Sequence, residues 1–219
     1  MKVWVVIPAY NEEQSIGGVL DALQREGWRD IIVVDDGSRD GTAEIARERG
    51  AVVLSHPKNM GLGAALRTGL RAALERGADC AVTFDADGQH DPKTVREMVD
   101  SLDGADFVIG VRRFTDIPLN KRVGNFILNF VTRLLGGVLT DSQSGMRALN
   151  RRALEAIQIR SNRYEVSSEL VVRANRLGLR IKEVPVRCFF TPYSKARGTT
   201  IASGLRIFIN MLKLRLTEL

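Results

Sequence analysis

Ala81-Val-Thr-Phe-Asp-Ala-Asp-Gly-Gln-His-Asp-Pro92 is the stretch from which the rest of the chain can be interpreted. It begins as a short apolar run, which is typical of a buried strand, and Pro92 suits the first turn of a helix. Because side chains two residues apart in an extended segment point the same way, Asp85, Asp87 and Gln89 can direct oxygen atoms at one point. Mg²⁺ and Mn²⁺ prefer such ligands and leave room for substrate phosphates. For so short a motif, a strand-to-helix turn with solvated acids is the alternative.

Four more apolar runs place this stretch in an α/β protein. Each run predicts a strand, those that begin at Val3 and Ile31 are predicted to be buried, and apolar residues at helical spacing lie between the runs. Short strands that alternate with helices predict a mostly parallel, twisted sheet flanked by helices. The predicted strands are residues 3–8, 31–34, 51–54, 80–84 and 107–110, and the predicted helices begin near Ile16, Ala43, Gly61 and Pro92.

Polar side chains follow four of these strands. Ligands bind beyond the carboxyl ends of parallel strands, so we predict a binding site there, although connecting loops are polar in any protein. Neither a G-x-G-x-x-G after the first strand nor a P-loop is present, which disfavours Rossmann dinucleotide enzymes and P-loop NTPases. Gly61 and Gly63 are interpreted as letting a helix start close to its neighbour. The strand ends carry Tyr10, Asn11 and Glu12, then Asp35 and Asp36, then Asp85 and Asp87, and finally Arg112 and Arg113.

The charge is divided unevenly along the 219 residues. Residues 1–110 hold 12 Lys/Arg against 19 Asp/Glu, and residues 111–219 hold 20 against 7. A basic second half can meet nucleic acid, anionic lipid headgroups or phosphorylated substrates. Nucleic acid is not expected, because no recognised motif or aromatic-rich strand accompanies the charge.

The cysteine and histidine content argues against a zinc-type site. Cys80 and Cys188 lie in separate apolar segments with no C-x-x-C motif, so they are interpreted as reduced core residues. His56 and His90 are the two histidines of the chain.

The second half of the chain has a different pattern. It predicts a helix over residues 118–136, a short strand and a helix from Arg151, a helix over 166–177, and an edge strand over 180–187, where Pro185 fits. The basic loop 193–198 leads to a last helix over 201–216 with a wide apolar arc. That helix suits a membrane interface, and packing on the domain or a homodimer interface is the equal alternative. No apolar run reaches the about 20 residues of a transmembrane helix.

Six segments of the chain resemble the family 2 glycosyltransferases. Two of the six are similar to the dolichol-phosphate mannose synthase group and its polyprenyl-phosphate relatives, namely Val108-Ile-Gly-Val-Arg112 and Asp141-Ser-Gln-Ser-Gly-Met-Arg147. The other four are Val6-Ile-Pro-Ala-Tyr-Asn-Glu-Glu13, Val33-Val-Asp-Asp-Gly-Ser-Arg-Asp-Gly-Thr42, Asn59-Met-Gly-Leu-Gly63 and Phe84-Asp-Ala-Asp-Gly-Gln-His-Asp-Pro92.

The resemblance implies a GT-A fold over residues 1–198, followed by the amphipathic helix of 199–219. It also implies a nucleotide-sugar donor, Mg²⁺ or Mn²⁺, and inversion at the anomeric carbon. Asp87, Arg112 and Arg122 are the implied catalytic residues. The nucleotide would be contacted by Pro8, Tyr10 and Glu12, and its base and ribose by Val34 and Asp36. The donor and its metal would be held by Asp85, Ala86 and Asp87, with Gln89 as a further metal ligand and Arg112 on the phosphates. The acceptor or its phosphate would be bound by Arg122 and Arg147, and the donor would be covered by Lys195 and Arg197.

The expected reaction moves a hexose from GDP-mannose or UDP-glucose to a polyprenyl or dolichyl phosphate. Mannose is open because 189–195 lacks an arginine and a glycine that some mannose synthases carry, and because Phe126 stands one turn after Arg122 in place of serine. A lipid phosphate is already anionic, so no general base is required. Glu169 would serve a hydroxyl acceptor or orient a site arginine. The enzyme is expected on the cytoplasmic face of the membrane, as a peripheral protein.

Three other functions remain open on the sequence. They are transfer to a hydroxyl acceptor, nucleotidyl transfer, and a non-catalytic nucleotide-sugar-binding module. The nucleotidyltransferase is disfavoured because no glycine-rich N-terminal loop with a following arginine is present.

Overall fold

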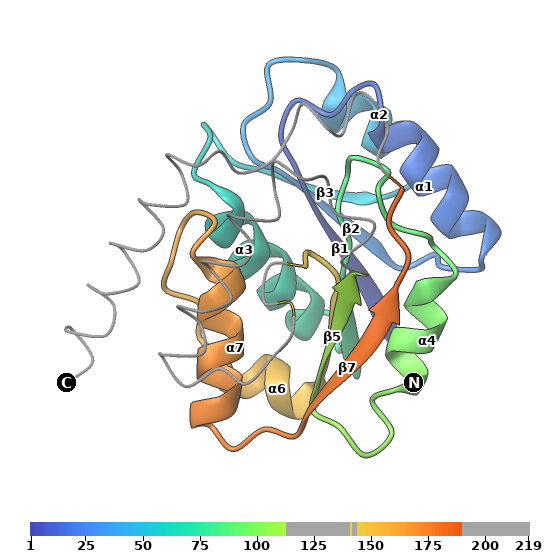
Figure 1. The fold of residues 1–219 in the computed structure, drawn as a ribbon. Helices are drawn as coiled ribbons and strands as arrows, with labels where there is room; N and C mark the ends of the chain where they lie inside the picture. The colour runs from blue at the N-terminus through green and yellow to red at the C-terminus, as the bar shows by residue number, and fades with distance from the viewer. Residues whose placement is uncertain (113–140, 142–143, 190–219) are drawn as a thin grey trace.

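A seven-stranded sheet forms the centre of the computed structural model, which describes residues 1–112, 141 and 144–189 (Figure 1). Its strand order is β3-β2-β1-β4-β6-β5-β7. All neighbours are parallel except β6, which is antiparallel to both β4 and β5. The strands are β1 (Val3–Ala9), β2 (Ile31–Asp35), β3 (Val52–Ser55), β4 (Cys80–Thr83), β5 (Phe107–Arg112), β6 (Arg147–Asn150) and β7 (Ile181–Val186).

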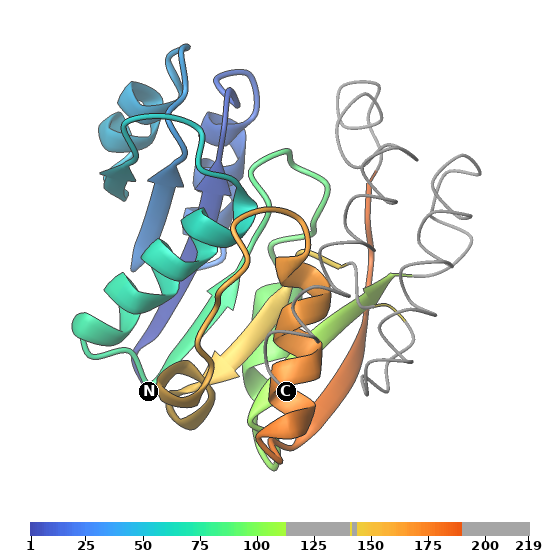
Figure 2. The same ribbon diagram turned by 90° about the vertical axis from the view of Figure 1, so that its left-hand side faces the viewer.

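Helices cover both faces of the sheet (Figures 1 and 2). In β1, Val5 and Ile7 pack into the core on one face, and Trp4 and Val6 into the core on the other, as the alternation of a strand dictates. The first core is closed by α1 (Ile16–Arg25), α2 (Thr42–Glu48) and α4 (Thr94–Asp100). The second is closed by α3 (Leu62–Glu75), α6 (Arg151–Ala156) and α7 (Val166–Arg176).

The predicted rim exists, because β1, β2, β4 and β5 all run in the same direction. The arrowheads of β5 and β7 mark this edge in Figure 1. The loops after β1 and β2 are joined there, since the Asn11 N–H donates to Ser38 Oγ (2.9 Å) and Asn11 Oδ1 accepts from the Arg39 N–H (2.9 Å). Antiparallel β6 starts at the rim with Arg147 and ends at the opposite edge with Asn150.

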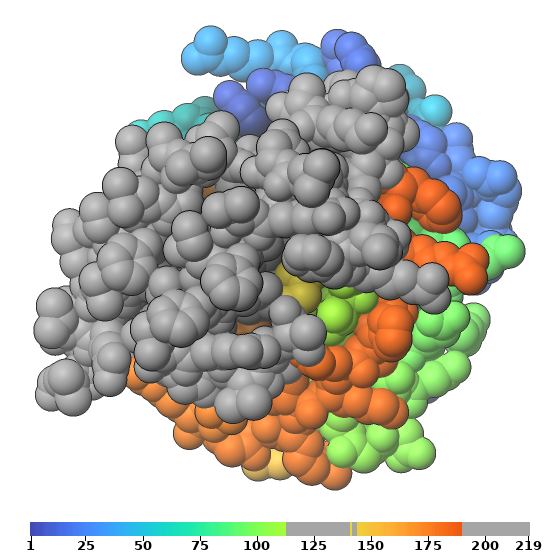
Figure 3. All heavy atoms as spheres, viewed as in Figure 1, coloured from blue at the N-terminus to red at the C-terminus, as the bar shows by residue number. Residues whose placement is uncertain are grey.

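The mostly parallel sheet flanked by helices is confirmed, and so is the position of β7 at a sheet edge. Pro185 pairs with Val111 of β5 there. In the space-filling view, residues of β7 (orange) and α4 (green) lie side by side on the described surface (Figure 3). The short strand predicted before Arg151 is β6, but its insertion between β4 and β5 was not predicted, because local sequence pattern does not show which strands pair.

The interpretation of Gly61 and Gly63 is also confirmed. A Cβ on Gly63 would lie 2.2 Å from the Ser161 carbonyl oxygen, and one on Gly61, whose φ is +100°, would lie 2.4 Å from that of Asn162. The Ala64 N–H donates to Asn162 O (3.2 Å), so α3 begins directly against the segment that precedes α7.

Several predictions fall on residues outside the described ranges. These are the helix over 118–136, the loop 193–198, the last helix over 201–216 and the boundary at 199. Among the described helices, none is long and apolar enough to cross a membrane. Both cysteines are free, as predicted, but only Cys80 is a core residue. Cys188 is half-buried just beyond β7, at the margin of the core.

Candidate active site

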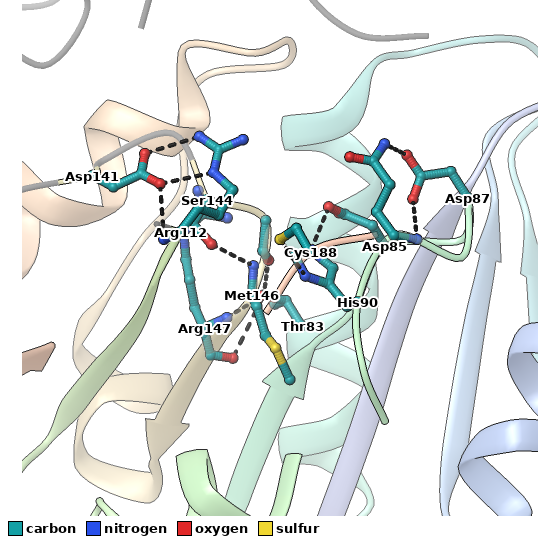
Figure 4. Close-up of polar contacts among 12 residues, drawn as sticks. Thr83, Asp85, Asp87, His90, Arg112, Asp141, Ser144, Met146, Arg147 and Cys188 are labelled. Carbon is teal, nitrogen blue, oxygen red and sulfur yellow. Dashed lines mark hydrogen bonds and ion pairs between the residues drawn. The ribbon is translucent and has the colours of Figure 1, made fainter. Parts of the chain in front are cut away.

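The end of β4 is tied directly to the start of β6. The Thr83 hydroxyl donates to the Gly145 carbonyl oxygen (2.6 Å) and accepts from the Arg147 N–H (3.1 Å). The antiparallel register pairs Thr83 with Arg147. Asp85, two residues past Thr83, is thereby brought against the segment that leads into β6 (Figure 4).

The Asp85 carboxylate lies between His90 and Gly145. Asp85 Oδ2 accepts from His90 Nε2 (2.9 Å). A Cβ on Gly145 would lie 2.2 Å from the same oxygen, so only glycine leaves room for this carboxylate. Burial disfavours the charged form of Asp85, but the His90 hydrogen bond and the charges of His90, Arg147 and Arg112 outweigh it and lower the pKa.

Asp87 lies beside Asp85 (Figure 4), and its side chain is bonded to Gln89. Asp87 accepts from the Gln89 N–H (3.1 Å) and from the Gln89 side-chain amide. Burial, together with the negative charges of Asp85 and Glu12, raises the pKa of Asp87 to about 6. Two acids that disfavour each other's charge, beside an amide, are a donor set that fits a hard divalent cation.

Such a cation would have to take ligands beyond these side chains. Within residues 1–112, 141 and 144–189, no group of three or more His, Cys, Asp or Glu side chains is placed to hold a metal. The donor set of Asp85, Asp87 and Gln89 is therefore incomplete without oxygens from a substrate, as is usual for Mg²⁺ beside phosphates.

Arg112, the last residue of β5, is held by Asp141. Its Nε donates to Asp141 Oδ2 (2.7 Å) and its Nη2 to Asp141 Oδ1 (2.9 Å), a bidentate pair with both side chains largely buried. Burial would lower the pKa of Arg112, but the bonds and charge of Asp141 raise it. Arg112 therefore stays charged and fixed in orientation at the rim.

Arg147 is the largest fully buried side chain among the described residues, at 1% exposure. Its side chain rises from β6 toward Arg112 and Ser144 (Figure 4). Its Nε and Nη2 are buried without a hydrogen-bond partner in the described part of the chain. Burial lowers the pKa of Arg147 to about 10, against the favourable charges of Asp85 and Asp141. Burying a guanidinium whose N–H groups lack acceptors costs free energy of folding, unless a bound anion accepts hydrogen bonds from them.

Asp36, predicted to hold the ribose, already binds a loop. Its Oδ1 accepts from His56 Nδ1 (2.7 Å) and the Met60 N–H (2.9 Å), and its Oδ2 accepts from the Gly61 N–H (2.7 Å). The second ring nitrogen of His56 contacts Thr68 Oγ1 (2.9 Å). The structure thus gives Asp36 a role in shaping the loop before α3, and its contact with a nucleotide stays a prediction.

The other residues predicted for the nucleotide lie on the same rim with different exposure. Tyr10 is 37% exposed, and Pro8 is half-buried. Glu12 is buried and accepts from Ser15 Oγ (2.7 Å), and its charge acts on Asp87. The side chains of Val34 and Ala86 are buried, so each would meet a nucleotide through its main chain.

Glu169 is a structural residue rather than a free base. Its Oε1 accepts from the Arg160 N–H (2.8 Å) and Arg173 Nε (2.7 Å), and its Oε2 accepts from the Ser161 N–H (2.8 Å). Burial opposes these bonds, but they lower the pKa of Glu169. The carboxylate holds the segment against which α3 begins.

The structure gathers Asp85, Asp87, Gln89, Arg112 and Arg147 at one end of β4, β5 and β6. Arg122, Lys195 and Arg197 lie outside the described residues. Sequence reasoning gave no role to three residues that shape the site: His90, Asp141 and Gly145. All three lie inside the quoted motifs, so the motifs located them, but their contacts with Cys188, Arg112 and Asp85, respectively, join residues far apart in the chain.

Comparison with known proteins agrees with this geometry. The family model "Glycosyl transferase family 2" matches residues 4–158. The UDP-N-acetylglucosamine–dolichyl-phosphate N-acetylglucosaminyltransferase of Methanococcus voltae is 41% identical, over 98% of this chain and 96% of that protein. The undecaprenyl-phosphate mannosyltransferase of Micrococcus luteus is 36% identical, over 85% and 83%.

A solved structure shares the fold. Glucosyl-3-phosphoglycerate synthase from Mycobacterium tuberculosis, in complex with Mn²⁺, UDP and glucosyl-3-phosphoglycerate, superimposes with a TM-score of 0.69 at 28% identity, covering 89% of this chain and 74% of that one. The expected GT-A fold is thereby confirmed. The family model matches most of the chain, and a relative that it covers almost completely is 41% identical. This chain therefore belongs to glycosyl transferase family 2 and is a glycosyltransferase.

Proposed function

We propose that this enzyme transfers one sugar from a nucleoside diphosphate-sugar to the phosphate of a polyprenyl or dolichyl phosphate, with a divalent cation. An oxygen of the acceptor phosphate attacks the anomeric carbon, the bond from that carbon to the diphosphate breaks, and the nucleoside diphosphate leaves. Configuration at the carbon inverts. The names of the relatives from Methanococcus voltae and Micrococcus luteus support the lipid phosphate.

The observation that carries the proposal is Arg147. Two of its nitrogens have no hydrogen-bond partner among the described residues, and the guanidinium experiences the charges of Asp85 and of Arg112, which Asp141 holds in place. Two guanidinium groups next to paired carboxylates suit a reaction in which two phosphorylated molecules meet at one cation. A lipid phosphate needs this positioning and no general base.

Asp85, Asp87 and Gln89 would hold the cation, which when bound would neutralise charge on the diphosphate leaving group. Arg112 would stabilise the same group, and Arg147 and Arg122 would orient the acceptor phosphate. Lys195 and Arg197 would close over the donor, and Tyr10, Glu12 and Pro8 would contact the nucleotide. These assignments rest on the motifs and on the placement of the described residues at one rim.

The acceptor is tested with a matched pair of lipids. Purified enzyme with Mn²⁺ is offered GDP-mannose, UDP-glucose and UDP-N-acetylglucosamine in separate reactions, each with polyprenyl phosphate or with the polyprenol of the same length. We expect one donor to give a lipid product with the phosphate and none with the alcohol. A product from the alcohol, or turnover with 3-phosphoglycerate but not with lipid, would refute the proposal.

The metal site is tested by Asp87→Ala. Because Asp87 would be a direct ligand, donor binding that depends on Mn²⁺ should fall by at least about 100-fold, as for loss of several kcal/mol of charge interaction. Isothermal titration of UDP and of GDP, with and without Mn²⁺, measures it. Glu13→Ala, on the neighbouring loop, is the control and should bind UDP as the wild type does. Equal affinity of Asp87→Ala and wild type in Mn²⁺ would remove Asp87 from the site.

Transfer to a hydroxyl is the second candidate, and one observation favours it. The solved structure with the same fold acts with a phosphoglycerate acceptor, as its bound product indicates. A hydroxyl acceptor requires a proton acceptor, and Glu169, which the sequence suggested, is occupied by three donors. A non-catalytic binding module would bind a donor and turn over no acceptor in the experiment above.

A lipid acceptor would place the enzyme at a membrane surface. The basic second half of the chain supports peripheral binding to anionic headgroups, and the nucleotide-sugar donor supports the cytoplasmic face. The helix predicted for residues 201–216 would lie in the membrane interface, pack on the domain or join two copies of the chain.

A further inference from the structure

His90 is a buried side chain for which the proposed reaction has no direct use. It is 5% exposed and follows the acidic motif by three residues. One ring nitrogen, Nε2, lies 2.9 Å from Asp85 Oδ2, and the other, Nδ1, lies 3.6 Å from Cys188 Sγ. Because an ionised carboxylate only accepts hydrogen bonds, Nε2 carries the proton that joins the ring to Asp85.

Other contacts fix the ring in this orientation. Phe84 meets it edge to face, with ring centroids 5.6 Å apart and planes at 65°. The backbone of His90 pairs with that of Cys188 in an antiparallel bridge, and the Phe189 N–H donates to Gln89 O (2.8 Å). His90 is thus held by Phe84, just past β4, and by the segment beyond β7.

Asp85 in turn has little freedom once His90 is in place. The Gly145 backbone closes its other side, where a Cβ would lie 2.2 Å from Oδ2 and 2.3 Å from Oδ1. By contrast, within the described residues the side chain of Asp87 makes hydrogen bonds only with the nearby Gln89. The two acids of the motif are therefore supported unequally.

We propose that His90 is a positioning residue that fixes the carboxylate of Asp85, leaving one of its oxygens directed at the donor side. The inference deepens the proposed function and rests on it for the metal role of Asp85. A hydrogen-bonded partner of a ligand commonly controls metal affinity by 10- to 100-fold, about the size of effect expected here.

The test compares His90→Gln with His90→Leu in the full chain. The glutamine amide can donate to Asp85 from close to the position of Nε2, whereas leucine fills the space and donates nothing. Mn²⁺ is titrated in the presence of UDP or GDP, whichever the wild type binds. We expect His90→Leu to raise the half-saturating Mn²⁺ concentration by about tenfold or more and His90→Gln to recover most of that loss. Thermal unfolding without metal checks that both variants fold.

Equal Mn²⁺ requirements in His90→Leu and wild type would overturn the inference, as would an equal loss in both variants. A second readout does not need a ligand. The chain has two histidines, so the Nε2–H proton of His90 can be followed by NMR against His56 as internal reference. It should be slow to exchange in the wild type and lost in Asp85→Ala.

Absence of that protected proton overturns the inference, whatever the protein binds. A protected proton together with a wild type that binds neither UDP nor GDP with Mn²⁺ refutes the proposed function instead, and leaves His90 as the residue that orients Asp85. The two failures are therefore distinguishable.

Discussion

Buried charges lie at both ends of the short strand β6, and they are treated in opposite ways. At one end, Asp106 is 1% exposed and accepts from Asn150 Nδ2 (3.0 Å), the Arg180 N–H (2.9 Å), Arg180 Nε (3.1 Å) and Nη2 (3.1 Å), and Arg152 Nη1 (3.3 Å). At the other end, Arg147 is equally buried and leaves two nitrogens without a partner in the described chain.

The difference separates a structural group from a functional one. Asp106 fastens the start of β5 to the end of β6 and the start of β7, with every acceptor in use. The desolvation cost of Arg147 is offset only in part by the charges of Asp85 and Asp141, and such a cost is tolerated where a substrate supplies the missing partner. A complete hydrogen-bond set thus indicates stability, and an incomplete one indicates binding.

Arg147→Met should have the largest effect at the rim. Methionine keeps the length and apolar stem but cannot bind a phosphate, so transferase activity should fall by about 100-fold or more. Stability should stay the same or rise by about 1–3 kcal/mol, because a buried unpaired charge is removed. Steady-state rates and urea unfolding of the same preparation measure both.

The combination is the informative result for Arg147. If Arg147→Met unfolds at much lower urea concentration than the wild type, the guanidinium is a structural group like Asp106, and the contrast between the two ends of β6 disappears. Unchanged activity would exclude Arg147 from the acceptor site.

Asp106→Asn should show the opposite combination. Its amide retains the shape but places N–H groups against the Arg180 donors, so the free energy of unfolding should fall by about 1–3 kcal/mol. Activity at a temperature where the variant is folded should remain within about twofold of wild type, because Asp106 lies at the edge of the sheet opposite the site. A large loss of activity in fully folded Asp106→Asn would show that the two ends are coupled.

A smaller effect is expected at acid pH, in the stability difference between wild type and Asp106→Asn. The hydrogen bonds and charge of Arg180 hold the pKa of Asp106 well below its ordinary value near 3.9, against the opposing effect of burial. A carboxylate with a lowered folded-state pKa contributes stability that is present above about pH 4 and is lost as the pH falls toward the folded pKa. The stability difference between wild type and Asp106→Asn should therefore shrink between about pH 5 and pH 3, as urea unfolding at these values would measure.

The sequence predicted the parts of the fold that depend on local pattern. Continuous apolar runs at Val3 and Ile31 identified buried strands, the run at Phe107 identified a further strand, and Pro185 identified the edge strand. The position of β6 was not predictable, because its pairing with β4 and β5 depends on contacts between residues about 40 to 70 positions apart, and such contacts leave no local periodicity.

The candidate site divides in the same way. The motifs located Asp85, Asp87, Arg112 and Arg147, and the rule for parallel strands put the first three at one edge. Arg147 joins them because antiparallel β6 starts at that edge. The sequence did not show which residues hold these side chains in place. Asp141, which binds Arg112, lies 29 positions from it, and Cys188, which contacts His90 beside Asp85, lies 98 positions from His90. The sequence therefore indicated which residues meet a substrate but not what holds them in place.

The place of β6 has a consequence for how the chain is made. The strands β3, β2, β1 and β4 can assemble as soon as residue 83 has been synthesised, whereas both sheet neighbours of β5 come later in the chain. Until residues 147–150 emerge from the ribosome, β4 presents an open edge and β5 has nothing to pair with, which is a state that invites aggregation. Slow translation just beyond residue 112, or a nascent chain stalled there, should make this enzyme depend on chaperones far more than its small size suggests.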